Sequence, residues 1–65
     1  MTCDAPRAAA ELIRLFGEEA RMIASRRVAL FLRHNQMEEM LCWVEISAWV
    51  AEYLRNDIRG DEKSH

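Results

Sequence analysis

The chain has 65 residues, a formal net charge of −2 and 51% hydrophobic residues. A chain of this length forms one small domain, which usually needs a disulfide, a metal, oligomerisation or very good helix packing to be stable. The hydrophobic content excludes a disordered chain, and the net acidity argues against a partner such as nucleic acid or an anionic membrane.

The N-terminal residues 1–5 are predicted to be a flexible leader. They carry no apolar segment of the kind found in secretory signals, and Cys3 follows no hydrophobic stretch suited to lipidation. The second cysteine, Cys42, is expected to be a small buried core residue. We therefore expect both thiols to be free and the protein to be cytoplasmic.

A single helical domain is predicted over residues 6–58, and its first arm covers residues 6–33. Asp4 is a favourable N-cap and Pro6 is tolerated in a first turn, so a helix is expected to begin here. Hydrophobic residues then recur at helical spacing on one face as far as Phe31.

Gly17 interrupts this first arm and allows two interpretations. It suits the position after a helix C-terminus, in which case Glu18 and Glu19 would begin a new helix. It also fits a continuous helix, at a cost of about 1 kcal/mol relative to alanine. Because the apolar spacing continues from Phe16 to Ala20 without a shift, we favour one arm that is kinked or broken at Gly17. A three-helix bundle is the alternative.

A turn is predicted at residues 33–36 and a second helical arm at residues 36–58. Asn35, with Glu38 three residues later, resembles a capping box that would start the second helix. Arg59 and Gly60 form a typical helix stop, so residues 59–65 are expected to be a polar tail. Two arms joined by a tight turn form an antiparallel helical hairpin, and the predicted fold class is all-α.

Residues 37–54 are hydrophobic on nearly all sides, although four glutamates make this run unsuitable as a membrane span. One face is predicted to pack against the first arm: Met37, Met40, Leu41, Val44, Ala48 and Ala51. A hairpin cannot cover the remaining apolar side chains, so we expect them to form the interface of a homodimeric four-helix bundle. The predicted interface residues are Trp43, Ile46, Trp49, Val50, Tyr53 and Leu54.

Arg27 projects from the apolar face of the first arm. A charged side chain at such a position must be paired or lie at an interface. The hairpin would place Arg27 level with residue 42, so we expect a buried ion pair with Glu45 or Glu38. An arginine that binds an anion or a partner is the alternative interpretation.

Candidate sites of other kinds are few. Two charged stripes repeat every seven residues, and we interpret them as solvated or mutually paired faces; they consist of Arg7, Arg14 and Arg21, and of Glu38, Glu45 and Glu52. His34, Glu38 and Cys42 have the i, i+4, i+8 spacing of metal ligands, but the chain lacks a second cluster of ligands, so we expect neither a metal nor a cofactor. With no nucleophile–base pair or phosphate-binding loop in the sequence, catalytic residues are not expected.

Part of the chain resembles a group of short, uncharacterised bacterial proteins. The resemblance covers residues 8–54 and is carried by an apolar helix, the pattern G-[DE]-x-A-x3-A-x2-R and a later W-x2-I. In this sequence the matching residues are Gly17, Glu18, Ala20, Ala24 and Arg27, followed by Trp43 and Ile46. His34 and Asn35 stand where the group has Gly-Asp. The resemblance implies an all-helical bacterial protein in which Gly17, Arg27 and Trp43 matter to the fold, and it implies no site.

These observations lead to three hypotheses about function. The first is a small non-enzymatic protein–protein interaction or regulatory module that acts through helix 36–58 and self-association. The second is a nucleic-acid-associated regulator that uses the face of Arg7, Arg14 and Arg21, which the net acidity disfavours. The third is a small metal or redox protein centred on His34 and Cys42.

Overall fold

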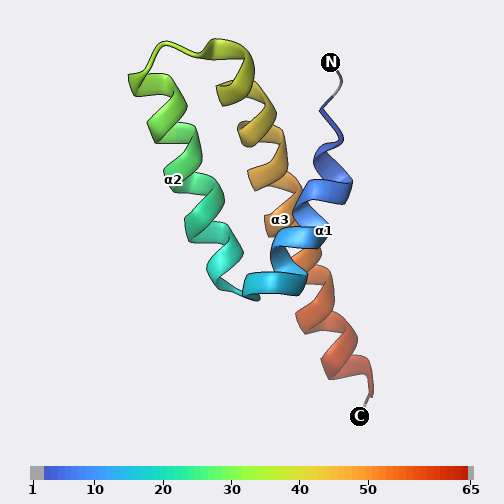
Figure 1. Ribbon diagram of the computed structural model, residues 1–65. Coiled ribbons are helices and arrows are strands. Elements are labelled where there is room, and N and C mark those ends of the chain that lie inside the picture. Colours follow the sequence, from blue (N-terminus) through green and yellow to red (C-terminus); the bar gives the residue numbers. More distant parts are fainter. Residues whose placement is uncertain (1–2, 65) are drawn as a thin grey trace.

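The computed structural model describes residues 3–64, and the side chains of residues 3–56. It consists of three helices, α1 (Ala5–Phe16), α2 (Glu19–Arg33) and α3 (Met37–Ser64), with no strand in the described part of the chain (Figure 1). The all-α class is therefore confirmed. None of these helices combines the length and apolar character that crossing a membrane requires.

Helix α3 is central, because it packs against both other helices, whereas α1 and α2 meet mainly at the connection between them (Figure 1). Helix α2 runs antiparallel to α3, and α1 runs in the same direction as α3. Of the two architectures that the sequence allows, the chain forms the three-helix arrangement.

The break between α1 and α2 occurs at Gly17. This residue has φ 63° and ψ −134°, a backbone conformation that residues with a Cβ rarely adopt. Its N–H donates to the Ile13 carbonyl at 2.7 Å and thereby caps the last turn of α1. The first arm is therefore broken at Gly17, one of the two possibilities that the sequence allows, and no helix runs through this residue. The steady apolar spacing across Gly17 does not require a continuous helix, because a glycine in this conformation redirects the chain between two amphipathic segments.

The turn between α2 and α3 uses Asn35 differently from the prediction. Asn35 has φ 65°, in the left-handed region where asparagine is tolerated. The N–H of Gln36 donates to the Phe31 carbonyl at 2.9 Å, and the N–H of Asn35 donates to the Leu32 carbonyl at 3.1 Å. These two bonds form a Schellman motif. Asn35 therefore ends α2 and does not act as the predicted cap of α3.

The start of α1 agrees with the prediction, and the end of α3 does not. Pro6 lies in the first turn and the Ala8 N–H donates to the Asp4 carbonyl at 3.0 Å, although the Asp4 side chain makes no capping hydrogen bond. Helix α3 continues through Gly60 to Ser64, beyond the predicted stop at Arg59-Gly60. A glycine inside a helix costs only about 1 kcal/mol relative to alanine, so it does not end a helix by itself.

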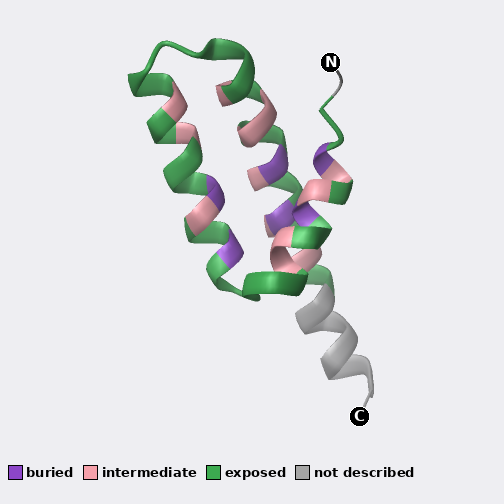
Figure 2. Cartoon of the chain, in the orientation of Figure 1, coloured by how far each residue is buried: buried purple, intermediate pink, exposed green. Residues whose placement is uncertain are grey.

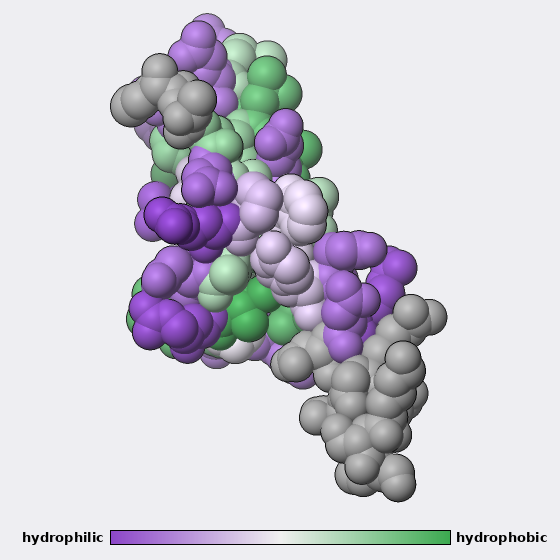
Figure 3. Space-filling view, turned by 90° about the vertical axis from the view of Figure 1, so that its right-hand side faces the viewer, coloured by the Kyte–Doolittle hydropathy of each residue, from purple (hydrophilic) through white to green (hydrophobic). Residues whose placement is uncertain are grey.

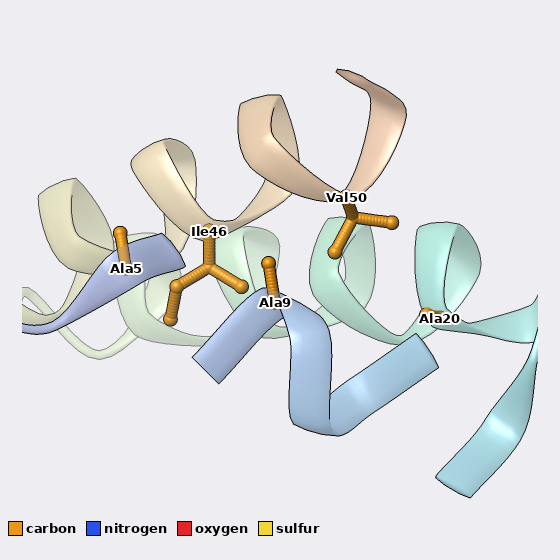
Figure 4. Close-up of a cluster of buried hydrophobic side chains, with 5 residues drawn as sticks. All are labelled: Ala5, Ala9, Ala20, Ile46 and Val50. Atoms are coloured by element: carbon orange, nitrogen blue, oxygen red, sulfur yellow. The ribbon is translucent and has the colours of Figure 1, made fainter. Parts of the chain in front are cut away.

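The core is small and rich in alanine. Six hydrophobic residues among those described are buried, and four of them are alanines. Ile46 and Val50 of α3 point toward Ala5 and Ala9 of α1 and toward Ala20 of α2 (Figure 4). Buried positions lie on the sides of the helices that face one another, and exposed positions cover the outer sides (Figure 2). Small side chains let the helices approach closely, but they bury little apolar area each.

Candidate interaction surface

Five of the six predicted interface residues fall on the inner side of α3, and Trp49 is the exception. Ile46 and Val50 are 3% and 0% exposed, so they belong to the core of the chain and are not available to a second subunit. Trp43, Tyr53 and Leu54 are half-buried and pack against this core. Trp49 remains 39% exposed and lies beside Tyr53, with their ring centroids 5.5 Å apart.

The opposite side of α3 carries an exposed apolar stripe. Met37, Leu41 and Val44 are 51%, 58% and 44% exposed, and with Ala48 they follow the i, i+4, i+7, i+11 spacing of one helix face. We call these four residues the α3 stripe. The prediction that this face packs against the first arm is wrong. The spacing of hydrophobic residues makes both sides of α3 apolar. The side of Ile46 is the buried one because α1 and α2 pack against it.

Helix α2 extends this apolar surface. Leu32 is 55% exposed, and Arg21, Ser25, Val28 and Leu32 share one side of α2 at the same helical spacing. This side of α2 borders the face of α3 that carries the stripe, because Arg21 lines a recess of about 270 Å³ together with Ala51, Leu54 and Arg55 of α3. Figure 3 shows hydrophobic side chains along one edge of the upper half of the molecule.

Charged residues border the α3 stripe on two sides. Glu38, Glu45 and Glu52 are exposed along one flank, and we call them the acidic edge. Arg21 and Arg55 line the same recess at the far end of the stripe, and we call them the basic corner. Within residues 3–56, the ion pairs are Arg7–Asp4 at 3.9 Å and Arg14–Glu11 at 2.7 Å, so neither the acidic edge nor the basic corner is paired within that range.

Arg27 does not form the predicted buried ion pair. Arg27, Glu45 and Glu38 are all exposed, and the guanidinium carbon of Arg27 lies 5.7 Å from the ring centroid of Trp43. Arginine over an indole face gains a cation–π interaction while its charge stays in contact with water. Arg27 therefore contacts an aromatic ring of α3 in place of a carboxylate.

The two cysteines form a disulfide between the segment before α1 and the first half of α3. Cys3 and Cys42 are 39 residues apart in sequence and their Cα atoms are 5.9 Å apart. The expectation of two free thiols is therefore wrong. The signal that sequence reasoning passed over was the even cysteine count in a chain so short that its core needs a covalent link.

The disulfide also removes one of the candidate metal ligands. The sulfur of Cys42 is bonded to Cys3, and His34 lies beyond the end of α2, so His34, Glu38 and Cys42 do not share one helix face. No group of three or more residues of ligand type gathers among the described residues.

The stripe of Arg7, Arg14 and Arg21 is divided by the break at Gly17. Arg7 and Arg14 lie on α1 and are paired with Asp4 and Glu11, whereas Arg21 lies on α2 beside α3. The three arginines therefore do not form one basic face.

Comparisons with protein-family models, with curated proteins and with solved structures find no match to this chain.

Proposed function

We propose that the chain is a small, non-enzymatic protein–protein interaction module that acts by self-association through the exposed face of α3. The observation that carries the proposal is the α3 stripe, whose three large apolar side chains are each about half exposed. Large contiguous apolar patches are uncommon on monomeric proteins and mark interaction sites. The contact lies on the helix predicted from the sequence, but on the side opposite Ile46 and Val50.

Self-association is supported by the size of the core. Most of the buried positions in the described part of the chain are alanines, and a single core in a domain of this length rarely supplies more than about 3–5 kcal/mol. Met37, Leu41 and Val44 are about half exposed, so covering them in a second copy would add roughly half of the about 1.5–3 kcal/mol that full burial of such a side chain contributes. The dimer would therefore stabilise the fold as well as form the contact.

The test is the solution mass of the protein, measured by light scattering after size exclusion over a hundredfold range of concentration. We expect twice the chain mass for the natural sequence and the mass of one chain for Leu41→Glu. Burying an unpaired carboxylate in the interface costs more than the contact gains.

Leu15→Glu is the matched control, because Leu15 is 62% exposed on α1 and Leu41 is 58% exposed on α3. It should retain the mass of the natural protein. A natural protein that stays monomeric at every concentration would refute self-association. If both variants dissociate equally, the contact does not run through the α3 stripe.

We also propose the cytoplasmic location predicted from the sequence, and the Cys3–Cys42 disulfide provides a test of it. Disulfides persist in oxidising compartments, and cytosolic thiols are kept reduced. A cytoplasmic protein should therefore have Cys3 and Cys42 alkylated in intact cells without prior reduction, whereas protection of both cysteines would place the chain in an oxidising compartment.

A further inference from the structure

The α3 stripe is bordered by charges of both signs that have no partner among residues 3–56. The acidic edge follows one flank of the stripe, and the basic corner lies at its end. The two arginines of the basic corner line one recess, and the three glutamates of the acidic edge recur every seven residues along one exposed flank. A second copy of the same surface can be oriented so that the acidic edge of each copy faces the basic corner of the other.

The packing of α2 on α3 determines where these charged groups lie along the α3 axis. Arg27 lies over Trp43, and Arg21 lies beside Ala51. In this antiparallel register Arg21 is level with the end of the α3 stripe and lies close to Glu52 in position along the α3 axis. Leu32, near the other end of α2, is level with the start of the stripe at Met37.

We infer that the occupant of this face is a second copy of the chain, related by a two-fold axis parallel to α3. This inference rests on the proposed function and specifies its geometry. Rotation about such an axis leaves each residue's position along the α3 direction unchanged. The α3 stripe of one copy therefore lies against α2 of the other copy, on the side of α2 that carries Arg21, Val28 and Leu32. Leu32 then meets Met37 and Leu41 of the second copy, and Arg21 meets Glu52.

The alternative two-fold axis, perpendicular to α3, is disfavoured by the same charges. It would lay the α3 stripes directly against each other in antiparallel fashion and bring the acidic edges of the two copies together, with Glu45 facing Glu45. Like charges that face each other across an interface oppose association. The parallel axis instead places the acidic edge of each copy beside the basic corner of the other.

Charge reversal tests this geometry without changing the apolar contact. Arg21→Glu and Glu52→Arg should each weaken the dimer about tenfold, because each homodimer would contain two like-charge contacts. An equimolar mixture of the two variants should recover the affinity of the natural protein, since both contacts of the mixed dimer would again join opposite charges. Sedimentation equilibrium of the separate variants and of the mixture measures these affinities.

Arg26→Glu is the control variant, because Arg26 is exposed on α2 but does not line the recess with Ala51 and Arg55. It should leave the dimer affinity unchanged. The recovery in the mixture is also a control for folding, because a variant that fails to fold cannot be rescued by mixing.

Two outcomes would overturn the inference, and they differ in what they imply. If the reversals weaken the dimer no more than Arg26→Glu, or mixing restores nothing, while Leu41→Glu still dissociates the protein, then the two-fold geometry is wrong and self-association stands. If the natural protein is monomeric throughout, both the geometry and the proposed function fail.

Discussion

At the scale of single residues, two positions with positive φ determine where the chain turns. Gly17 occupies a conformation that only glycine adopts readily, whereas Asn35 occupies the left-handed region that asparagine tolerates. Each is followed closely by a new helix, so the two residues together divide the chain into three elements.

Gly17→Ala should lower the free energy of unfolding by about 2 kcal/mol, because a Cβ at φ 63° and ψ −134° is strained. An added Cβ would meet no atom within 4 Å, so backbone strain alone is responsible. Urea denaturation followed by circular dichroism measures the change. Glu18→Ala, at an ordinary helical φ of −65°, should change the value by less than about 0.5 kcal/mol. Equal effects of the two substitutions would argue against a break at Gly17.

At the scale of the elements, α1 is held against α3 by small side chains and by a covalent bond. Ala5 and Ala9 provide its buried contacts, with Leu12 and Ile13 partly buried beside them. Alanine buries little apolar area, so this packing alone is weak. The Cys3–Cys42 disulfide joins the start of α1 to α3 and restricts the separation of the two helices.

Reduction of this disulfide should lower the free energy of unfolding by about 4 kcal/mol, as estimated from the entropy of closing a loop with a sequence separation of 39. The measurement is urea denaturation with and without dithiothreitol. A variant with both Cys3→Ser and Cys42→Ser should match the reduced protein and should not respond to dithiothreitol. If the reductant leaves the natural protein unchanged, the disulfide does not contribute to its stability.

At the scale of the whole molecule, α3 has two apolar sides and the chain covers one of them. Helices α1 and α2 bury the side of Ile46 and Val50, and the α3 stripe on the other side remains exposed. The proposed second copy would cover the exposed side and would pair the acidic edge with the basic corner.

Trp49→Ala separates this geometry from the interface predicted by the sequence. Trp49 is five residues after Val44, so the two lie about 140° apart on the helix, and Trp49 contacts Tyr53 within the chain. We expect the variant to keep the mass of the natural protein and to lose about 1 kcal/mol of stability with the aromatic pair. Dissociation into single chains, observed by light scattering, would instead place Trp49 in the interface.

Local patterns in the sequence determined the helical class, the start of α1 at Asp4 and Pro6, and the turn before Met37. Proline position, turn residues and apolar spacing act over one or two helical turns, so a single sequence is enough to read them. The role of Gly17 as a helix end was also visible as one of two interpretations, although its steady flanking pattern favoured the wrong alternative.

The tertiary structure alone decided which side of α3 is buried, what Arg27 contacts and whether the two cysteines are joined. A helix that is apolar on several sides has no local preference among them, and the buried side follows from where α1 and α2 pack. Because the chain reverses at Gly17, Cys3 comes beside Cys42 and the helices cover Ile46 and Val50. The candidate surface of Met37, Leu41 and Val44 is the side that remains, and it could be identified only after the packing of all three helices was known.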